Sequence, residues 1–120
     1  MERIISPSAV SGSVTPPCSK SYAQRALAVA LLAEGESIIG NVEMCDDTRS
    51  ALRCIEALGA EVQHIDESTL KIRGGLAPST DRLHIGESGL ATRLFTPLAS
   101  LCNQPITIEG EGTILYRPIS

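Results

Sequence analysis

Apolar residues recur at helical spacing in three stretches of the chain. Over residues 19–34 they lie three and four positions apart, which is the period of one buried helix face. The same pattern covers residues 47–58 and residues 88–101. Gly35 and Gly59 follow the first two stretches, and glycine readily adopts the left-handed backbone that ends many helices. Pro97 lies inside the third stretch and predicts a kink or a break there.

Six shorter stretches have the composition and alternation of β-strands. They predict strands over residues 12–15, 37–42, 61–65, 69–73, 82–85 and 105–109. Turn-forming residues at 66–68 separate the third and fourth strands, which are therefore expected to form a hairpin. Asp46 or Asp47 is expected to cap the second helix. The alternation of strands and helices predicts an α/β (α+β) fold.

The composition is that of one folded domain with an aliphatic core. The 120 residues are 42% hydrophobic and 20% charged, and Tyr22, Phe95 and Tyr116 are the only aromatic residues. A net charge of -4 and so few aromatic side chains argue against general binding to nucleic acid, which favours basic surfaces and stacking platforms. The sequence contains no apolar stretch of membrane-spanning length and no signal-peptide pattern, so no membrane association is expected.

Four cysteines, at positions 18, 45, 54 and 102, are scattered along the chain. They form no C-x-x-C pair, and no histidine lies at ligand spacing, so a zinc site is not expected. Single scattered thiols are typical of proteins in a reducing compartment. A cytoplasmic location is therefore expected.

Positive charge is concentrated at the start of the first predicted helix. Lys20 and Arg25 lie there together with the hydroxyl groups of Ser19 and Ser21. Unpaired backbone N–H groups and the helix dipole make such an end attractive to anions. The nucleotide-binding P-loop requires a glycine before the lysine, where this chain has Ser19. Taken alone, the segment fits an anion site and an ordinary capped surface helix equally well.

Two closely spaced glycines, Gly86 and Gly89, mark the turn from a predicted strand into the third helix. They would let the backbone approach a ligand, but the turn matches neither the dinucleotide-binding motif nor the nucleophile elbow of hydrolases. By itself it favours an ordinary strand-to-helix turn. Arg117 precedes Pro118 in extended backbone and has a guanidinium that can bind a carboxylate or phosphate through two hydrogen bonds.

Taken together, these segments occur in the order and spacing of one known family. The chain resembles the N-terminal part of the EPSP synthases (3-phosphoshikimate 1-carboxyvinyltransferases) along nearly all of its 120 residues. The matching positions are Pro17–Ser21 with Arg25 and Ala26, Asn41, Asp46–Thr48, Leu58–Ala60, Gly86, Ser88, Gly89, Arg93, Arg117 and Pro118.

The resemblance implies a reaction between two anionic substrates. Members of the family transfer the enolpyruvyl group of phosphoenolpyruvate to the 5-hydroxyl of shikimate 3-phosphate and release phosphate, with no metal or organic cofactor. Lys20 matches the catalytic lysine that contacts both substrates. Ser21 and Arg25 match residues that bind shikimate 3-phosphate, and Gly89 and Arg117 match residues that bind phosphoenolpyruvate.

The resemblance also implies an architecture. Family domains are built from βαβαββ units, and this chain is expected to hold a leading strand within residues 1–15, one unit over about residues 16–75 and the start of the next over about residues 80–120. Family enzymes are longer and close two similar domains over their substrates. We therefore expect the chain to be a fragment that is inactive alone and that needs the remainder of the same enzyme.

Some positions depart from the family pattern. Gln24 stands where asparagine is common, and Glu87 and Leu90 replace residues that are usually small or amide-bearing. A carboxylate at position 87 is expected to repel phosphoenolpyruvate if its side chain faces the pocket. Two alternatives stay open. The related UDP-N-acetylglucosamine enolpyruvyl transferase shares the fold, and a non-catalytic anion-binding module could reuse the same unit.

Overall fold

The computed structural model describes residues 1–119, which contain three α-helices, five β-strands and one 3-10 helix. Their order is α1 (Lys20–Leu32), β1 (Glu36–Ile39), α2 (Asp46–Ala57), β2 (Glu61–His64), β3 (Leu70–Arg73), β4 (Arg82–His84), α3 (Gly89–Ala99), β5 (Thr107–Glu109) and η1 (Gly112–Tyr116). The predicted mixture of helices and strands is confirmed.

Two small sheets organise the strands. In the first, β3 lies between β1 and β2 and is antiparallel to both, which confirms the predicted hairpin. At the hairpin turn, the Asp66 carboxylate accepts a hydrogen bond from the Ser68 N–H at 2.9 Å. In the second sheet, β4 and β5 are parallel, because α3 connects them as a crossover.

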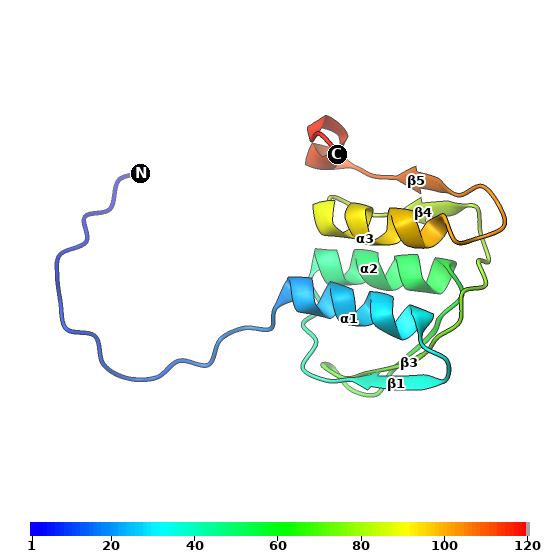
Figure 1. Ribbon diagram of the computed structural model, residues 1–120. Coiled ribbons are helices and arrows are strands. Elements are labelled where there is room, and N and C mark those ends of the chain that lie inside the picture. Colours follow the sequence, from blue (N-terminus) through cyan, green and yellow to red (C-terminus); the bar gives the residue numbers. More distant parts are fainter. Residues whose placement is uncertain (120) are drawn as a thin grey trace.

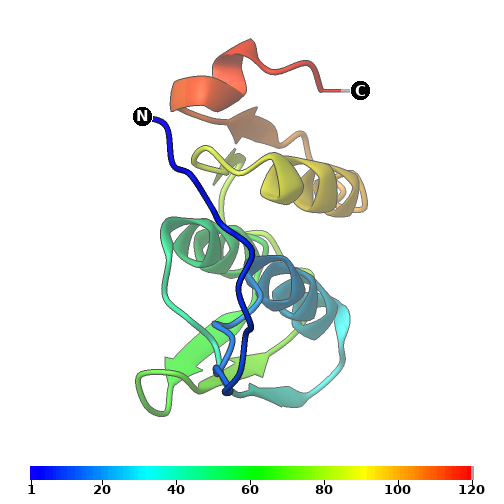
Figure 2. The ribbon, with the colours of Figure 1, turned by 90° about the vertical axis from the view of Figure 1, so that its left-hand side faces the viewer.

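The helices α1 and α2 lie between the two sheets (Figure 1). Seen end-on, they cover one face of the β1–β3–β2 sheet, and on their other side α3 packs against both helices while β4 packs against α2 (Figure 2). Leu70 and Ile72 of β3 are fully buried beneath the helices. Leu27 of α1 and Ile55 of α2 are fully buried as well. Phe95 of α3 is also fully buried and is the aromatic side chain of an otherwise aliphatic core.

The helix starts differ in how they are capped. Ser19 and Ser88 precede α1 and α3, and their hydroxyl oxygens accept backbone N–H groups within the first turn. The predicted capping of α2 by Asp46 or Asp47 is wrong, because Cys45 occupies the cap position. Both aspartates lie in the first turn instead, where their charge still interacts favourably with the positive end of the helix dipole.

The helix ends follow expectation in part. The α1 helix ends at Leu32 and Ala33 is its cap residue. Gly35 therefore lies beyond the helix-ending position that was predicted for it. The α3 helix is not broken at Pro97 but continues for two more residues to Ala99. At the end of α2, Gly59 has a φ of 118° and directly follows the capping residue, as predicted.

The N-terminal arm, residues 1–18, forms no helix or strand within the described chain. It runs away from the folded body as an extended segment (Figure 1). The strand predicted over residues 12–15 is therefore wrong, since a strand requires a partner for its backbone hydrogen bonds and the arm has none here. No helix within residues 1–119 combines the length and the apolar character that a membrane span requires.

Candidate functional site

The N-terminal ends of all three helices lie at the same end of the helical layer (Figure 1). This arrangement follows from the topology, because α1, α2 and α3 run in one direction and the strands return the chain. The arm joins α1 at this end, and η1 lies near it. Three positive helix ends and their unpaired N–H groups therefore gather on one side of the protein, which favours the binding of an anion there.

A groove of about 630 Å³ lies at this end. It contains the ammonium of Lys20 and two guanidinium groups, but also four carboxylates, so its charge is mixed. The lining residues are Lys20, Cys45, Asp46, Asp47, Arg49, Ser50, Arg53, Gly86, Glu87 and Glu111. The groove therefore joins the starts of α1 and α2 to the turn before α3 and to the segment before η1.

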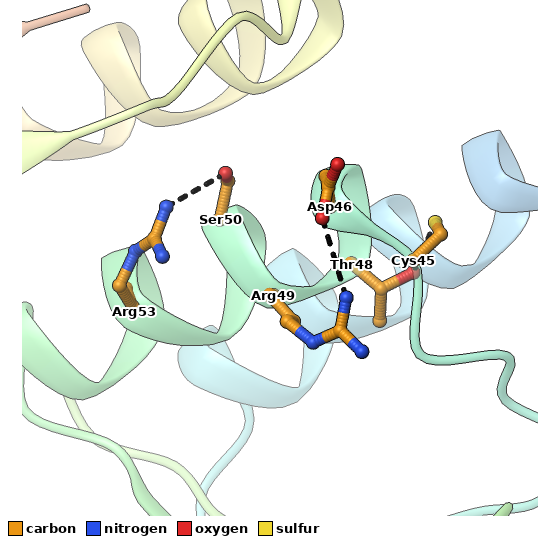
Figure 3. A network of polar contacts seen from close by, with 6 residues as sticks. All are labelled: Cys45, Asp46, Thr48, Arg49, Ser50 and Arg53. Atoms are coloured by element: carbon orange, nitrogen blue, oxygen red, sulfur yellow. Dashed lines mark hydrogen bonds and ion pairs between the residues drawn. The ribbon is translucent and has the colours of Figure 1, made fainter.

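Two arginines of the groove were not identified from the sequence. Arg49 and Arg53 are four residues apart on α2, and each contacts a side chain three positions earlier (Figure 3). Arg49 donates to the Asp46 carboxylate at 3.3 Å, and Arg53 donates to the Ser50 hydroxyl at 3.0 Å. Their spacing on a predicted helix was the available signal, since residues four apart share a helix face.

The turn before α3 reaches the groove because Gly86 has no side chain. Gly86 is buried and has a φ of 61°, and a β-carbon added there would lie 2.5 Å from the Ser50 hydroxyl oxygen. The same added atom would lie 3.8 Å from a guanidinium nitrogen of Arg53. A larger residue at position 86 would therefore crowd the Ser50 side chain and strain a backbone with a positive φ.

The structure brings Gly89, the first residue of α3, close to Arg117, which follows η1. A β-carbon at Gly89 would lie 3.8 Å from Nη1 of Arg117 and 3.2 Å from Nη1 of Arg93. Arg93 donates to the Gly89 carbonyl at 3.1 Å, and Arg117 donates to the Thr113 hydroxyl at 3.0 Å. Two exposed guanidinium groups thus flank the first residue of α3.

The other predicted site residues are more dispersed. Lys20 lines the groove, whereas Arg25 lines a separate, largely apolar hollow of about 360 Å³ together with Tyr22 and Val29. Ser21 is exposed on the first turn of α1. Within residues 1–119, therefore, the five predicted residues do not share one pocket.

The carboxylate of Glu87 faces this region rather than pointing away from it. Glu87 lines the groove that contains Lys20, and its side chain packs over Gly112, where a β-carbon would overlap its carboxyl group. The groove therefore has a negative charge next to the turn that leads into Gly89. This charge opposes the attraction that Lys20 exerts on an anion.

Among the titratable residues that line the groove, Cys45 has a thiol with a shifted pKa. Partial burial raises its pKa, but hydrogen bonds from Thr48 and Asp47 and the charge of Lys20 outweigh that effect, so the pKa of the Cys45 thiol is lowered. Its sulfur lies 3.3 Å from the Thr48 hydroxyl oxygen. Within residues 1–119, no group of three histidine, cysteine or acidic side chains is arranged to hold a metal ion.

Comparison with known proteins gives one consistent family. A sequence profile of EPSP synthase (3-phosphoshikimate 1-carboxyvinyltransferase) matches residues 4–120. The 3-phosphoshikimate 1-carboxyvinyltransferase of Chlamydia muridarum is 41% identical over 120 residues, which cover 97% of this chain and 27% of that protein. The enzyme of the same name from Caldivirga maquilingensis is 36% identical over 115 residues, which cover 96% of this chain and 28% of that protein.

Among solved structures, an EPSP synthase from Acinetobacter baumannii has a similar fold, with a TM-score of 0.73 and 24% sequence identity. The match covers 90% of this chain and 25% of that one. The chain thus spans about a quarter of the length of the relatives that it matches. Because the family profile covers all but the first three residues, the chain belongs to the EPSP synthase (3-phosphoshikimate 1-carboxyvinyltransferase) family.

Proposed function

We propose that the whole protein transfers the enolpyruvyl group of phosphoenolpyruvate to the 5-hydroxyl of shikimate 3-phosphate. A carbon–oxygen bond forms between the hydroxyl and the enolpyruvyl group, and the bond to the phosphate leaving group breaks. The observation that carries this proposal is the family match along residues 4–120, together with relatives that are named for this activity. The gathered helix ends with Lys20 support it, since both substrates carry several negative charges.

Each matched residue has a proposed role. Lys20 contacts both substrates and is the catalytic residue, because an ammonium between two anions lowers their mutual repulsion. Ser21 and Arg25 bind shikimate 3-phosphate. Gly89 and Arg117 bind phosphoenolpyruvate, and the closeness of the Arg117 guanidinium to the first turn of α3 supports this pairing.

The proposed site is one wall of a larger one. The groove has four carboxylates against three cationic side chains, so it offers little net attraction for an anion by itself. The chain spans 27% of the length of a related enzyme, and further cationic residues are proposed to come from the remainder of the protein. We therefore propose that the 120-residue chain alone does not catalyse the reaction. We also propose a cytoplasmic location, in keeping with four free thiols.

Substitution of the two basic residues tests these roles in the whole enzyme. Lys20→Ala and Arg25→Ala should each lower kcat/KM by an amount equivalent to about 2–5 kcal/mol, the scale for removing one partner of a desolvated charge pair. Arg73→Ala is the matched control, because Arg73 is exposed on the face of β3 away from the helices. Steady-state kinetics with both substrates measures the effect. Unchanged kcat/KM in both variants would refute the assigned roles.

The acceptor is tested separately. Phosphate release by the whole enzyme should require shikimate 3-phosphate, and release only with UDP-N-acetylglucosamine would assign the protein to the related transferase.

Calorimetric titration of the 120-residue chain with shikimate 3-phosphate should detect weak binding at most, since much of the proposed contact surface lies elsewhere. A submicromolar Kd would instead mean that this chain holds a complete site.

A further inference from the structure

A buried hydrogen bond joins the first and third helices near the proposed site. Gln24 lies one turn after Lys20 on α1 and is 2% exposed, and Ser88 immediately precedes α3 and is 5% exposed. The Ser88 hydroxyl donates to Oε1 of Gln24 at 3.0 Å. No other side-chain hydrogen bond within residues 1–119 connects α1 to the start of α3.

Ser88 is held in place by several bonds of its own. Its hydroxyl oxygen accepts the Ala91 N–H at 3.0 Å, and its carbonyl oxygen accepts the Thr92 hydroxyl at 3.0 Å. Its N–H donates to the Ile85 carbonyl at 3.2 Å. The Ser88 hydroxyl thus accepts from the Ala91 N–H and donates to Oε1 of Gln24. Gln24 therefore contacts a rigid part of the α3 start.

Apart from Gln24 and Thr92, the buried residues of α1 and α3 are apolar. Ala23 and Leu27 of α1 and Ala91 and Phe95 of α3 belong to the same core. Contacts between aliphatic surfaces hold helices together but tolerate small shifts along the helix axis, because they have no direction. A buried polar pair is directional and costly to break, and such pairs are known to set the register between helices.

We propose that Gln24 is a positioning residue for the anion site. Through Ser88 it fixes the first turn of α3, and with it the Gly89 backbone and the flanking Arg93, relative to Lys20 on the first turn of α1. This inference rests on the proposed function, in which Lys20 and Gly89 bind the same substrate. Reacting groups must be held closely, since a misplacement of about 1 Å can reduce a rate about a hundredfold.

Amide exchange in the 120-residue chain tests the link without any ligand. Gln24→Met keeps the length of the side chain and removes the acceptor. It should raise the exchange rate of the Ala91 N–H about three- to tenfold relative to that of Leu31 in α1, because the bonded Ser88 hydroxyl loses its partner. Leu27→Val is the matched control. It removes one buried methylene group from α1, and should change both rates by the same factor.

Kinetics of the whole enzyme test the consequence for the site. Gln24→Met should raise the KM for phosphoenolpyruvate at least about fivefold, and Leu27→Val should leave it within about twofold. If Gln24→Met does not fold, Ser88→Gly removes the other partner of the bond while keeping an acceptable cap residue, and the KM is then the readout because the Ala91 N–H loses its own acceptor. Equal exchange at Ala91 and Leu31, or an unchanged KM despite altered exchange, would overturn the proposal. Absence of phosphoenolpyruvate turnover by the unsubstituted enzyme would instead overturn the proposed function, and the exchange data would still be interpretable.

Discussion

Two cysteines on the same helix show how much a residue's chemistry depends on its surroundings. Cys54 lies in the core, where burial raises the pKa of its thiol to about 12. Cys45 lies at the start of α2 beside Lys20 and Thr48, and the pKa of its thiol is lowered. Cys45 is thus a thiol of the groove whose pKa is lowered by hydrogen bonds and, to a smaller extent, by the charge of Lys20.

The pH dependence of alkylation measures this effect. The rate of Cys45 labelling by iodoacetamide should rise with pH through the thiol pKa and then level off. Its midpoint should be lower in the folded chain than in the urea-denatured chain. Lys20→Met should move the folded midpoint upward, because removal of a nearby positive charge destabilises the thiolate. Cys54 should stay unlabelled in the folded chain.

Lys71→Met is the control for that measurement. Lys71 forms an ion pair with Glu36 at 3.2 Å on the β1–β3–β2 sheet and does not line the groove. Its removal should leave the Cys45 midpoint unchanged. Equal midpoints in the folded and denatured chain would contradict the assignment of Cys45 and Lys20 to one electrostatic environment.

At the scale of elements, the end of α2 is closed by a characteristic pair of backbone hydrogen bonds. The Ala60 N–H donates to the Ile55 carbonyl at 2.9 Å, and the Gly59 N–H donates to the Glu56 carbonyl at 3.1 Å. These two bonds form a Schellman motif, with glycine at the left-handed position. The returning chain also packs against it, because the Ala77 N–H donates to the Leu58 carbonyl at 2.8 Å.

Substitution at this glycine should be unusually destabilising. A β-carbon at Gly59 would lie 2.5 Å from the Ala77 carbonyl oxygen, so Gly59→Ala combines backbone strain with a clash against backbone. We expect a loss of about 3 kcal/mol or more in the free energy of unfolding, measured by urea denaturation. Gly35→Ala is the control, because Gly35 also has a positive φ but has open space around it. It should cost about 1–2 kcal/mol, and equal losses would contradict the clash.

At the scale of the whole molecule, the chain consists of a folded body and an extended arm. The radius of gyration is 17.3 Å, whereas a compact chain of this length would have about 14 Å. Five large apolar side chains of the arm are each at least 91% exposed, namely Met1, Ile4, Ile5, Val10 and Val14. Residues 1–17 are therefore exposed, and only Cys18 at the end of the arm is half-buried against the body.

Removal of the arm tests this division. A chain that begins at Cys18 should unfold with a free energy within about 0.5 kcal/mol of that of the full chain, because residues 1–17 are exposed. Ser19→Ala in the full chain should be more damaging and cost about 1 kcal/mol, since Ser19 caps α1. Urea denaturation measures both. A larger loss from truncation than from Ser19→Ala would show that the arm packs on the body.

The sequence by itself determined the helices, most of the strands, the β2–β3 hairpin and the family. These features depend on local periodicity, turn residues and a pattern of motifs, all of which can be read along the chain. The strand expected within residues 1–15 failed because strand formation depends on a partner that local pattern does not supply. Capping of α2 by aspartate failed because the helix begins one residue earlier than its apolar stripe suggested.

Only the tertiary structure decided which side chains share a surface. It placed Arg49 and Arg53 in the groove with Lys20, separated Arg25 from that groove, and joined Gln24 to Ser88 across 64 positions of sequence. Such contacts depend on the packing of helices that are distant in the chain, and no local pattern encodes them. The family residues could therefore be named from sequence, whereas their arrangement around the common end of three helices required the fold.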